Sequence, residues 1–258
     1  MRILFLADVF GSPGRLILEQ DLPSLREKLA IDFCLVNAEN ATNGAGLTPK
    51  HAERILAAGA DAITLGNHTL RRQEIVSYLA TAERVVRPAN LSRFVPGVGM
   101  SVLATADGSE VAVISLLGAL FMNASQGPFE VVDQLVEEAS RRTPVVLVDF
   151  HAEATSEKVG LSRWLDGRVT AVFGSHTHVQ TNDARVLPGG TAAITDAGMT
   201  GPHDSVIGVR AELAIERMRT GMHVRFEPAE GGVRIEGALV ECDLNGRATS
   251  CEAVRFPT

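Results

Sequence analysis

The chain has 258 residues, of which 45% are apolar, so it can bury a sizeable core and is not a disordered protein. Its formal net charge is −7 and no segment is dense in lysine or arginine, which argues against binding long nucleic acid in a basic groove. The three cysteines form no CxxC motif, and no apolar run reaches the roughly 18 residues of a membrane span, so we expect a cytoplasmic protein without a membrane partner.

Short apolar runs alternate with helical patterns over the first 82 residues. Strands are predicted at 2–7, 33–37 and 61–65, and helices at 13–30, 48–58 and 71–82. The helix at 48–58 has an N-cap at Thr48 and a proline at its first position, Pro49. Such alternation is typical of βαβ units with parallel strand pairing.

The second part of the chain mixes strand patterns. Residues 100–106 and 110–117 flank an Asp107-Gly108 turn, which predicts a hairpin. The following elements are helices at 129–142 and 157–165, and strands at 144–149, 169–174, 183–187, 191–195, 205–215, 222–227 and 232–241. Parallel strands followed by antiparallel ones predict an α/β fold. We expect a four-layer α-β-β-α sandwich of two mixed sheets, formed by a single domain over residues 1–258.

Polar side chains directly follow several of the apolar runs. They are Asp8; Glu39 and Asn40; Asn67 and His68; His151; and His176 and His178. Each cluster alone is also compatible with a turn, a helix cap or a structural histidine. Together they predict one crevice at the carboxyl ends of the strands, where α/β proteins bind their ligands. Oxygen and imidazole donors without thiolates suit a pair of hard or borderline metals, so we predict a dinuclear phosphoesterase site.

The spacing within two clusters constrains their geometry. Glu39 and Asn40 are adjacent, so both reach the same metals only where the strand ends and the backbone turns. His176 and His178 are two residues apart, and an extended segment would place both rings on one face. His68, beside the candidate ligand Asn67, is available to protonate a leaving group.

The residues that line the substrate pocket are harder to predict. Asn43 lies in the loop Asn43-Gly44-Ala45-Gly46. Two interpretations of this loop stay open: it approaches a phosphate through backbone N–H groups, or it is an ordinary connection. The other candidates are Phe121, Met122, Asn123 and His203.

With these residues in view, the chain resembles the calcineurin-like metallophosphoesterase superfamily. The closer likeness is to its YmdB-like branch of bacterial 2′,3′-cyclic-nucleotide phosphodiesterases. It covers nearly the whole chain and includes NAENATNGAGL, LGNHT, DFHAEATSEK and GSHTHVQTND. Phe10 stands where the wider superfamily has the histidine of its first motif. Glu39 replaces its bridging aspartate, and Thr69 replaces its acidic residue after Gly-Asn-His; the close branch shares these changes.

The resemblance implies a metallophosphoesterase-type fold and a ligand set for two metal ions. One metal would be held by Asp8, Glu39, Asn40 and His178. The other would be held by Glu39, Asn67, His151 and His176. Glu39 would bridge the two, and His68 would be the proton donor. The ions are expected to be iron or manganese, with zinc or magnesium also compatible with these ligands.

The implied reaction is hydrolysis of a 2′,3′-cyclic nucleotide by a metal-bound hydroxide. Two carboxylates and one hydroxide facing two divalent cations leave a net charge of about +1, which attracts a phosphodiester to an acidic protein. Two alternatives stay open. One is a phosphomonoesterase or 3′,5′-cyclic-nucleotide phosphodiesterase on the same site. The other is a metal-bearing regulatory or RNA-associated binding protein with incidental hydrolysis. A small nucleotide is the expected partner, and association into a homo-oligomer is left open.

Overall fold

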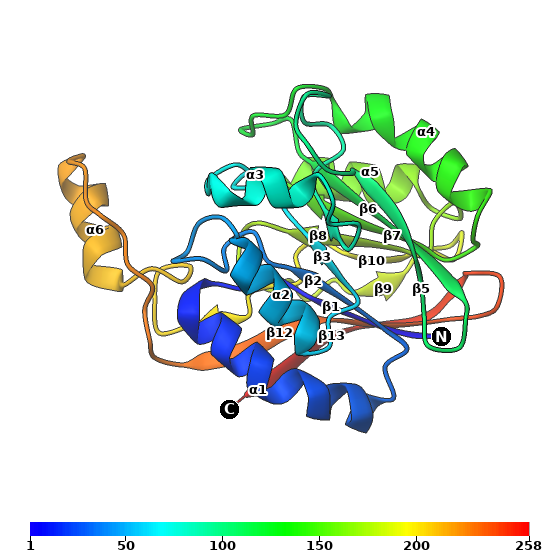
Figure 1. Cartoon of the computed structure of the whole chain (residues 1–258), viewed down its shortest axis with the longest axis horizontal. Coiled ribbons are helices and arrows are strands. Elements are labelled where there is room, and N and C mark those ends of the chain that lie inside the picture. Colours follow the sequence, from blue (N-terminus) through cyan, green and yellow to red (C-terminus); the bar gives the residue numbers. More distant parts are fainter. Residues whose placement is uncertain (258) are drawn as a thin grey trace.

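Two β-sheets lie face to face between layers of helices in the computed structural model, which describes residues 1–257 (Figure 1). The first sheet has the spatial order β11 (Gly201–Pro202), β12 (Val233–Cys242), β1 (Arg2–Leu6), β2 (Phe33–Asn37), β3 (Ala62–Thr64) and β4 (Val85–Val86), and β13 (Ala248–Pro257) also pairs with β12. The second sheet has the order β5 (Met100–Ala104), β6 (Glu110–Leu117), β7 (Val146–His151), β8 (Ala171–Ser175), β10 (Ala192–Ile194) and β9 (Arg185–Val186).

Helices cover the outer face of each sheet. Those packed on the first sheet are α1 (Gly11–Leu29), α2 (Pro49–Ala57) and α3 (Glu74–Leu79). Those packed on the second are α4 (Pro128–Ser140) and α5 (Thr155–Trp164). The predicted α/β sandwich of two mixed sheets is therefore confirmed.

In each sheet, the parallel strands have their carboxyl ends at the same edge. In the first sheet β1, β2, β3 and β4 pair in parallel, and in the second β6, β7, β8 and β10 do so. Parallel neighbours end at the same edge, so the segments that follow them lie side by side.

The inner faces of the sheets form a shared apolar core. Phe5 of β1 stacks on Phe173 of β8, with ring centroids 4.6 Å apart, and both side chains are buried. Phe33 of β2 and Val113 of β6 belong to the same cluster. This packing fixes one sheet relative to the other.

Local sequence signals explain most element boundaries. Thr48 caps α2, its hydroxyl accepting from the His51 N–H, and Pro49 begins the helix. Asp107 and Gly108 form the turn between β5 and β6, where Gly108 has φ +85°. The helix predicted at 71–82 is shorter in the structure, Glu74–Leu79.

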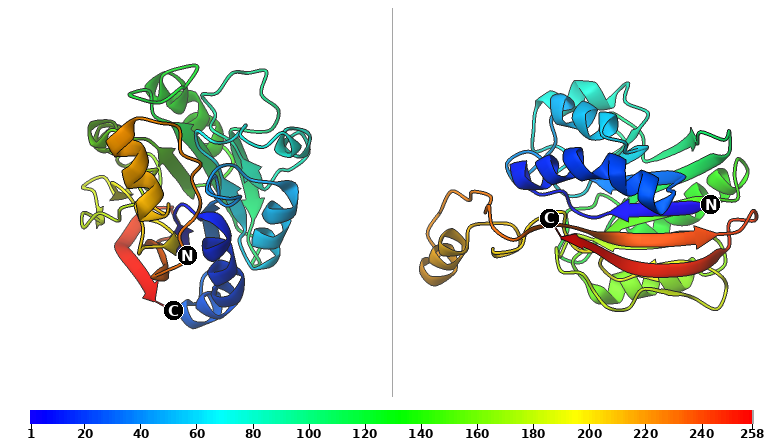
Figure 2. Two further views of the ribbon diagram at one scale, coloured as in Figure 1. Left: turned by 90° about the vertical axis from the view of Figure 1, so that its left-hand side faces the viewer. Right: turned by 90° about the horizontal axis from the view of Figure 1, so that it is seen from below.

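Two predicted strands are wrong. Residues 205–215 and 222–227 form no strand of either sheet; the region contains α6 (Ala211–Thr220), which projects away from the sandwich (Figure 2). Residues 211–219 are strong helix formers, and the helix ends at Gly221 with φ +66°. Apolar and polar residues alternate in parts of this segment, and that alternation is also typical of a strand. The prediction also missed β4, β11 and β13.

The three cysteines have free thiols. Cys34 is buried in β2, and that burial raises the pKa of its thiol to about 12. Among residues 1–257, no helix combines the length and apolar character needed to cross a lipid bilayer.

Replacing Phe5 by alanine tests the packing between the sheets. Phe5→Ala is expected to lower the free energy of unfolding by about 3–5 kcal/mol, because it leaves a cavity opposite Phe173. Phe94→Ala is the matched control, since Phe94 is 81% exposed and its loss should change stability little. Urea denaturation of both variants measures the difference; equal midpoints would contradict this account of the core.

Candidate metal centre

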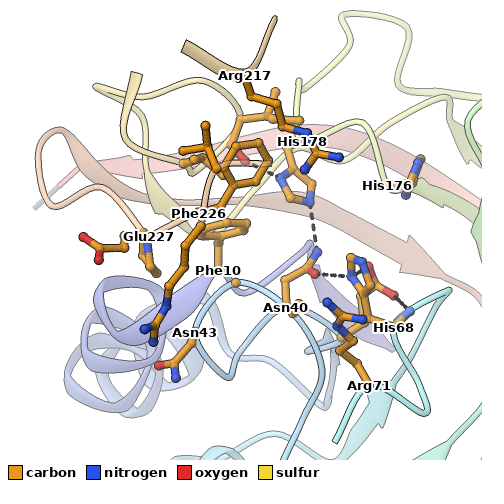
Figure 3. Close-up of a pocket in the computed structure, with 18 of the residues that line it drawn as sticks. Phe10, Asn40, Asn43, His68, Arg71, His176, His178, Arg217, Phe226 and Glu227 are labelled. Carbon is orange, nitrogen blue, oxygen red and sulfur yellow. Dashed lines mark hydrogen bonds and ion pairs between the residues drawn. The ribbon is translucent and has the colours of Figure 1, made fainter. Parts of the chain in front are cut away.

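The predicted ligands follow the carboxyl ends of strands in both sheets, and Figure 3 shows Asn40, His68, His176 and His178 around one cavity. Asp8 follows β1, Glu39 and Asn40 follow β2, and Asn67 and His68 follow β3, all in the first sheet. The second sheet contributes the last residue of β7, His151, and the segment after β8 that carries His176 and His178. Segments far apart in the chain thus supply one site.

One group of donor atoms converges on the His151 ring. Its Nε2 lies 3.2 Å from Glu39 Oε1, 3.1 Å from Asn67 Oδ1 and 3.1 Å from His176 Nδ1. The ligand atoms of Glu39, His151 and His176 all lie within 4.8 Å of one another. Oxygen and nitrogen lone pairs at this spacing are what a borderline metal ion requires.

A second group lies next to the first. His178 Nε2 is 3.0 Å from the Asn40 side-chain amide and 3.9 Å from Asp8 Oδ2. Asn40 Oδ1 in turn lies 2.7 Å from His68 Nδ1, and the His68 backbone N–H donates to Glu39 Oε2 at 2.8 Å. Glu39 therefore contacts His151 of the first group and His68 beside the second group, so its carboxylate lies between the two.

Two buried oxygens indicate that a cation fits here. Asp8 Oδ1 and Glu39 Oε1 are buried, and neither accepts a well-formed hydrogen bond from the described residues. Leaving a buried carboxylate oxygen without a donor is costly unless a cation interacts with it. Gly66 adds space for the cluster, since a side chain there would collide with His151 and Glu39. The residues present thus suit the metal ions that the resemblance implied.

Each histidine is oriented by a partner on its other ring nitrogen. His178 Nδ1–H donates to the Ile207 carbonyl at 2.8 Å, and His176 Nε2 lies 3.1 Å from Glu153. His151 Nδ1 lies 3.0 Å from the Ser175 hydroxyl. These contacts leave the other nitrogen of each ring directed into the cluster, the arrangement found around metal-binding histidines.

Behind His151, a buried polar network joins the two sheets. The Ser175 hydroxyl donates to Asp149 Oδ1 at 2.6 Å. Asp149 Oδ2 accepts from Asn37 of β2 at 2.9 Å and from the Thr64 hydroxyl of β3. All these side chains are buried. The network therefore fixes His151 relative to the first sheet, and the sequence pattern alone does not reveal it.

The backbone at the site is strained. Asp8, His176 and His178 have φ of +30°, +102° and +64°, although none is glycine. The extended geometry assumed for His176 and His178 is therefore wrong, because β8 ends at Ser175. A turn with positive φ, rather than strand alternation, brings these two rings to the cluster.

Burial and neighbouring charges shift the pKa values of the ligands. Burial raises the pKa of Asp8 to about 8. Burial would also raise the pKa of Glu39, but the charge and hydrogen bonds of His151 and His68 hold it well below its usual value. Burial opposes protonation of His151, yet the Glu39 carboxylate raises its pKa to about 9. Glu39 is thus held as the anion that binds a cation, which would compete with the His151 proton.

A cavity of about 950 Å³ opens over the cluster. Asn40, His68, His176 and His178 lie on its floor, and Asn43 lines it, as the sequence analysis considered. Its walls also carry residues that the sequence analysis did not identify: Phe10, Arg71, Arg72, Arg217, Arg225 and Phe226. Several of these come from the segment around α6, whose structure was mispredicted.

The remaining pocket candidates lie elsewhere. Phe121, Met122 and Asn123 do not line this cavity in the described part of the chain, and Phe121 is 87% exposed. Glu157 of α5 accepts the backbone N–H groups of Ala119 and Leu120, and this anchors their loop to the outer helical layer. His203 is also absent from the lining; its Nε2 lies 3.1 Å from the Met199 carbonyl.

The chain is similar to one family of proteins over nearly its whole length. The family described as YmdB-like protein matches residues 4–254. A Bacillus subtilis (strain 168) protein named 2′,3′-cyclic-nucleotide 2′-phosphodiesterase is 47% identical over 243 residues, which cover 94% of this chain and 92% of the relative.

Solved structures of other proteins have the same fold as this chain. A Mycoplasma pneumoniae protein whose structure is described as that of a novel phosphatase has a TM-score of 0.91 and 36% identity, covering 100% of this chain and 93% of that one. A 5′-nucleotidase precursor from Thermus thermophilus has a TM-score of 0.63 and 13% identity, covering 100% of this chain and 54% of that one. The second likeness concerns the fold alone.

Glu39→Gln should abolish loading of both metals, because it removes the charge of the carboxylate that is predicted to bridge them. His68→Ala should keep both metals, since it removes no predicted ligand. Elemental analysis of the purified variants measures the metal content of each. Glu138→Gln, on the exposed face of α4, is the matched control and should load normally. Full occupancy in Glu39→Gln would contradict the assignment of Glu39 as the shared ligand.

Proposed function

The chain belongs to the YmdB-like protein family, and on this premise we propose that it is a metal-dependent phosphodiesterase that hydrolyses 2′,3′-cyclic nucleotides with His68 as proton donor. The observation that carries the proposal is the position of His68. It lies beside the candidate ligands and lines the cavity, with 35% of its side chain exposed.

Seven side chains would hold two metal ions. Asp8, Asn40 and His178 would bind one, Asn67, His151 and His176 the other, and Glu39 both. When bound, the ions supply Lewis acidity toward a water molecule and the phosphate oxygens. We propose iron or manganese, because the oxygen and imidazole donors suit these ions, although zinc and magnesium fit the same donor types.

The surroundings of His68 suit a proton donor. Its Nδ1 lies 2.7 Å from Asn40 Oδ1 and 3.0 Å from Glu39 Oε1, and these two acceptors fix a proton on that nitrogen. Nε2 is then the nitrogen that gives up a proton. In the reaction, water adds to phosphorus, the bond from phosphorus to the ribose 2′ oxygen breaks, and Nε2–H protonates that oxygen.

The cavity walls offer binding groups for a nucleotide. Arg71 and Arg217 line the same cavity as His68 and His178, so its walls carry guanidinium groups (Figure 3). Guanidinium groups bind phosphate oxygens in a bidentate manner. Phe10, whose ring meets that of His178 edge to face at 5.5 Å, adds an apolar surface for the base or ribose.

A second candidate is phosphomonoester hydrolysis on the same site. The similarity to the Mycoplasma pneumoniae protein, which is described as a phosphatase, favours it. Both reactions would use the same ligands and the same water, and they differ in the leaving group and the charge of the phosphate.

A substrate panel separates the two candidates. With manganese or iron added, we expect turnover of 2′,3′-cyclic nucleotides to exceed that of 3′,5′-cyclic nucleotides and of phosphomonoesters, because the strained five-membered ring is opened most easily. A chelator should abolish turnover, and readdition of the metal should restore it. Faster hydrolysis of monoesters would favour the phosphatase.

His68→Ala tests the proton donor. With a 2′,3′-cyclic nucleotide, kcat should fall about 10²–10⁴-fold, the usual contribution of a general acid. With bis(p-nitrophenyl) phosphate the loss should be much smaller, because p-nitrophenolate leaves without being protonated. Equal losses for both substrates would contradict a proton-donor role, while unchanged metal content excludes a collapsed site.

We also propose a cytoplasmic location. The free thiols of Cys34, Cys242 and Cys251 suit a reducing compartment.

A further inference from the structure

We propose that the preferred substrate is not a free mononucleotide but the 2′,3′-cyclic phosphate end of a short oligoribonucleotide. At least one further nucleotide would occupy a groove formed by Asn43, Arg225 and Phe226. The inference rests on the proposed function, because it extends the same site, and it names the class of substrate that this site takes.

The shape of the cavity is the first argument. The cavity of about 950 Å³ adjoins a second one of about 330 Å³, since the two share lining residues. Asn43, Arg225 and Phe226 line both, and the second cavity reaches Ser12 and Pro13 at the start of α1. The first cavity alone is at the upper end of the ~300–1,000 Å³ typical for drug-sized ligands. The groove thus extends beyond the space that one cyclic nucleotide fills.

The charges along this groove are the second argument. Arg225 is exposed and, within residues 1–257, its side chain has no ion pair or hydrogen bond. Other arginines are paired: Arg210 with Glu212 and Glu227, for example. An unpaired guanidinium on a cavity wall is available to a phosphate. Because Arg225 lies where the two cavities meet, it suits the phosphodiester that joins the cyclic nucleotide to its neighbour.

An aromatic surface lies at the same junction. Phe226 is 40% exposed, and the Arg217 guanidinium lies 5.0 Å from the centroid of its ring. Bases stack on such aromatic side chains without sequence preference. Phe226 therefore offers a platform for a base next to the cation that would bind its phosphate.

The charges also limit the length of the substrate. Glu227 lines both cavities and is ion-paired with Arg210, whereas Glu230 lines only the second, and the whole chain has a net charge of −7. The Glu230 carboxylate would repel further phosphates in the second cavity. The groove therefore suits one or two additional nucleotides rather than a long RNA.

The chemistry at the cluster is the same for both kinds of substrate. Water adds to phosphorus, the bond to the 2′ oxygen breaks, and a 3′-phosphomonoester with a free 2′-hydroxyl remains. Cleavage of RNA by attack of a 2′-hydroxyl on the adjacent phosphodiester leaves such cyclic ends. A reaction of that class would supply the substrate.

The test compares adenosine 2′,3′-cyclic phosphate with diadenylate that ends in a 2′,3′-cyclic phosphate. In the unchanged protein, kcat/KM for the dinucleotide should be higher by about tenfold or more, the effect of one charge-assisted contact. Arg225→Gln should bring this ratio close to one. Arg219→Gln, an exposed arginine of α6 that does not line either cavity, should keep the ratio.

Equal kcat/KM for the two substrates, or a ratio that Arg225→Gln leaves unchanged, would overturn the inference while the phosphodiesterase activity itself stands. No turnover of either substrate by the metal-loaded protein would instead refute the proposed function. Arg225 is exposed and contacts no carboxylate within residues 1–257, so loss of folding is not expected to obscure the result. Circular dichroism of the variant checks this.

Discussion

The buried carboxylate of Glu39 is the constraint on which the rest of the structure depends. It lies against the rings of His68 and His151, and one of its oxygens accepts no well-formed hydrogen bond within the described residues. A chain would not bury such a group without a cation to interact with it. The parallel strands place Glu39 at the end of one sheet and His151 at the end of the other. The Phe5–Phe173 contact keeps those ends together. The apolar core thus holds Glu39 and His151 close together, although they belong to different sheets.

The stability of the core offsets the cost of unfavourable backbone conformations at the cluster. Asp8, His176 and His178 adopt positive φ, each at some energetic cost, and the remaining structure must hold them there. The Asp149 network contributes to this, because Asn37 and Thr64 come from one sheet and Ser175 from the other. Its hydrogen bonds satisfy a carboxylate that burial would otherwise destabilise. The same bonds hold the His151 ring at a fixed angle. Structural and functional roles are combined in one group of buried side chains.

Features set by residues close together in the sequence can be predicted from it, whereas features that depend on distant segments cannot. Asp8, Glu39 and His151 were identified because an apolar strand followed by a polar ligand is a local pattern. The convergence of His176 and His178 was expected for a wrong reason, since positive φ cannot be read from spacing. Arg217, Arg225 and Phe226 were missed because their segment folds back over the cavity, and nothing in its sequence marks that path. Asp149 looked like an ordinary strand residue, although its position two residues before His151 places both on one face.

The distribution of charge connects these observations to substrate choice. An acidic protein repels extended polyanions, so any attraction for a phosphodiester must be local. In the proposed function this attraction would have two sources at different positions: metal ions at the strand ends, and guanidinium groups on the cavity walls. The first would act on the phosphate that reacts, and the second on groups farther along the substrate. Glu230 lines the second cavity and not the first, so the favourable potential would end within a short distance of the cluster. On the proposed function, a substrate would gain from both sources only if it is longer than one nucleotide and still short.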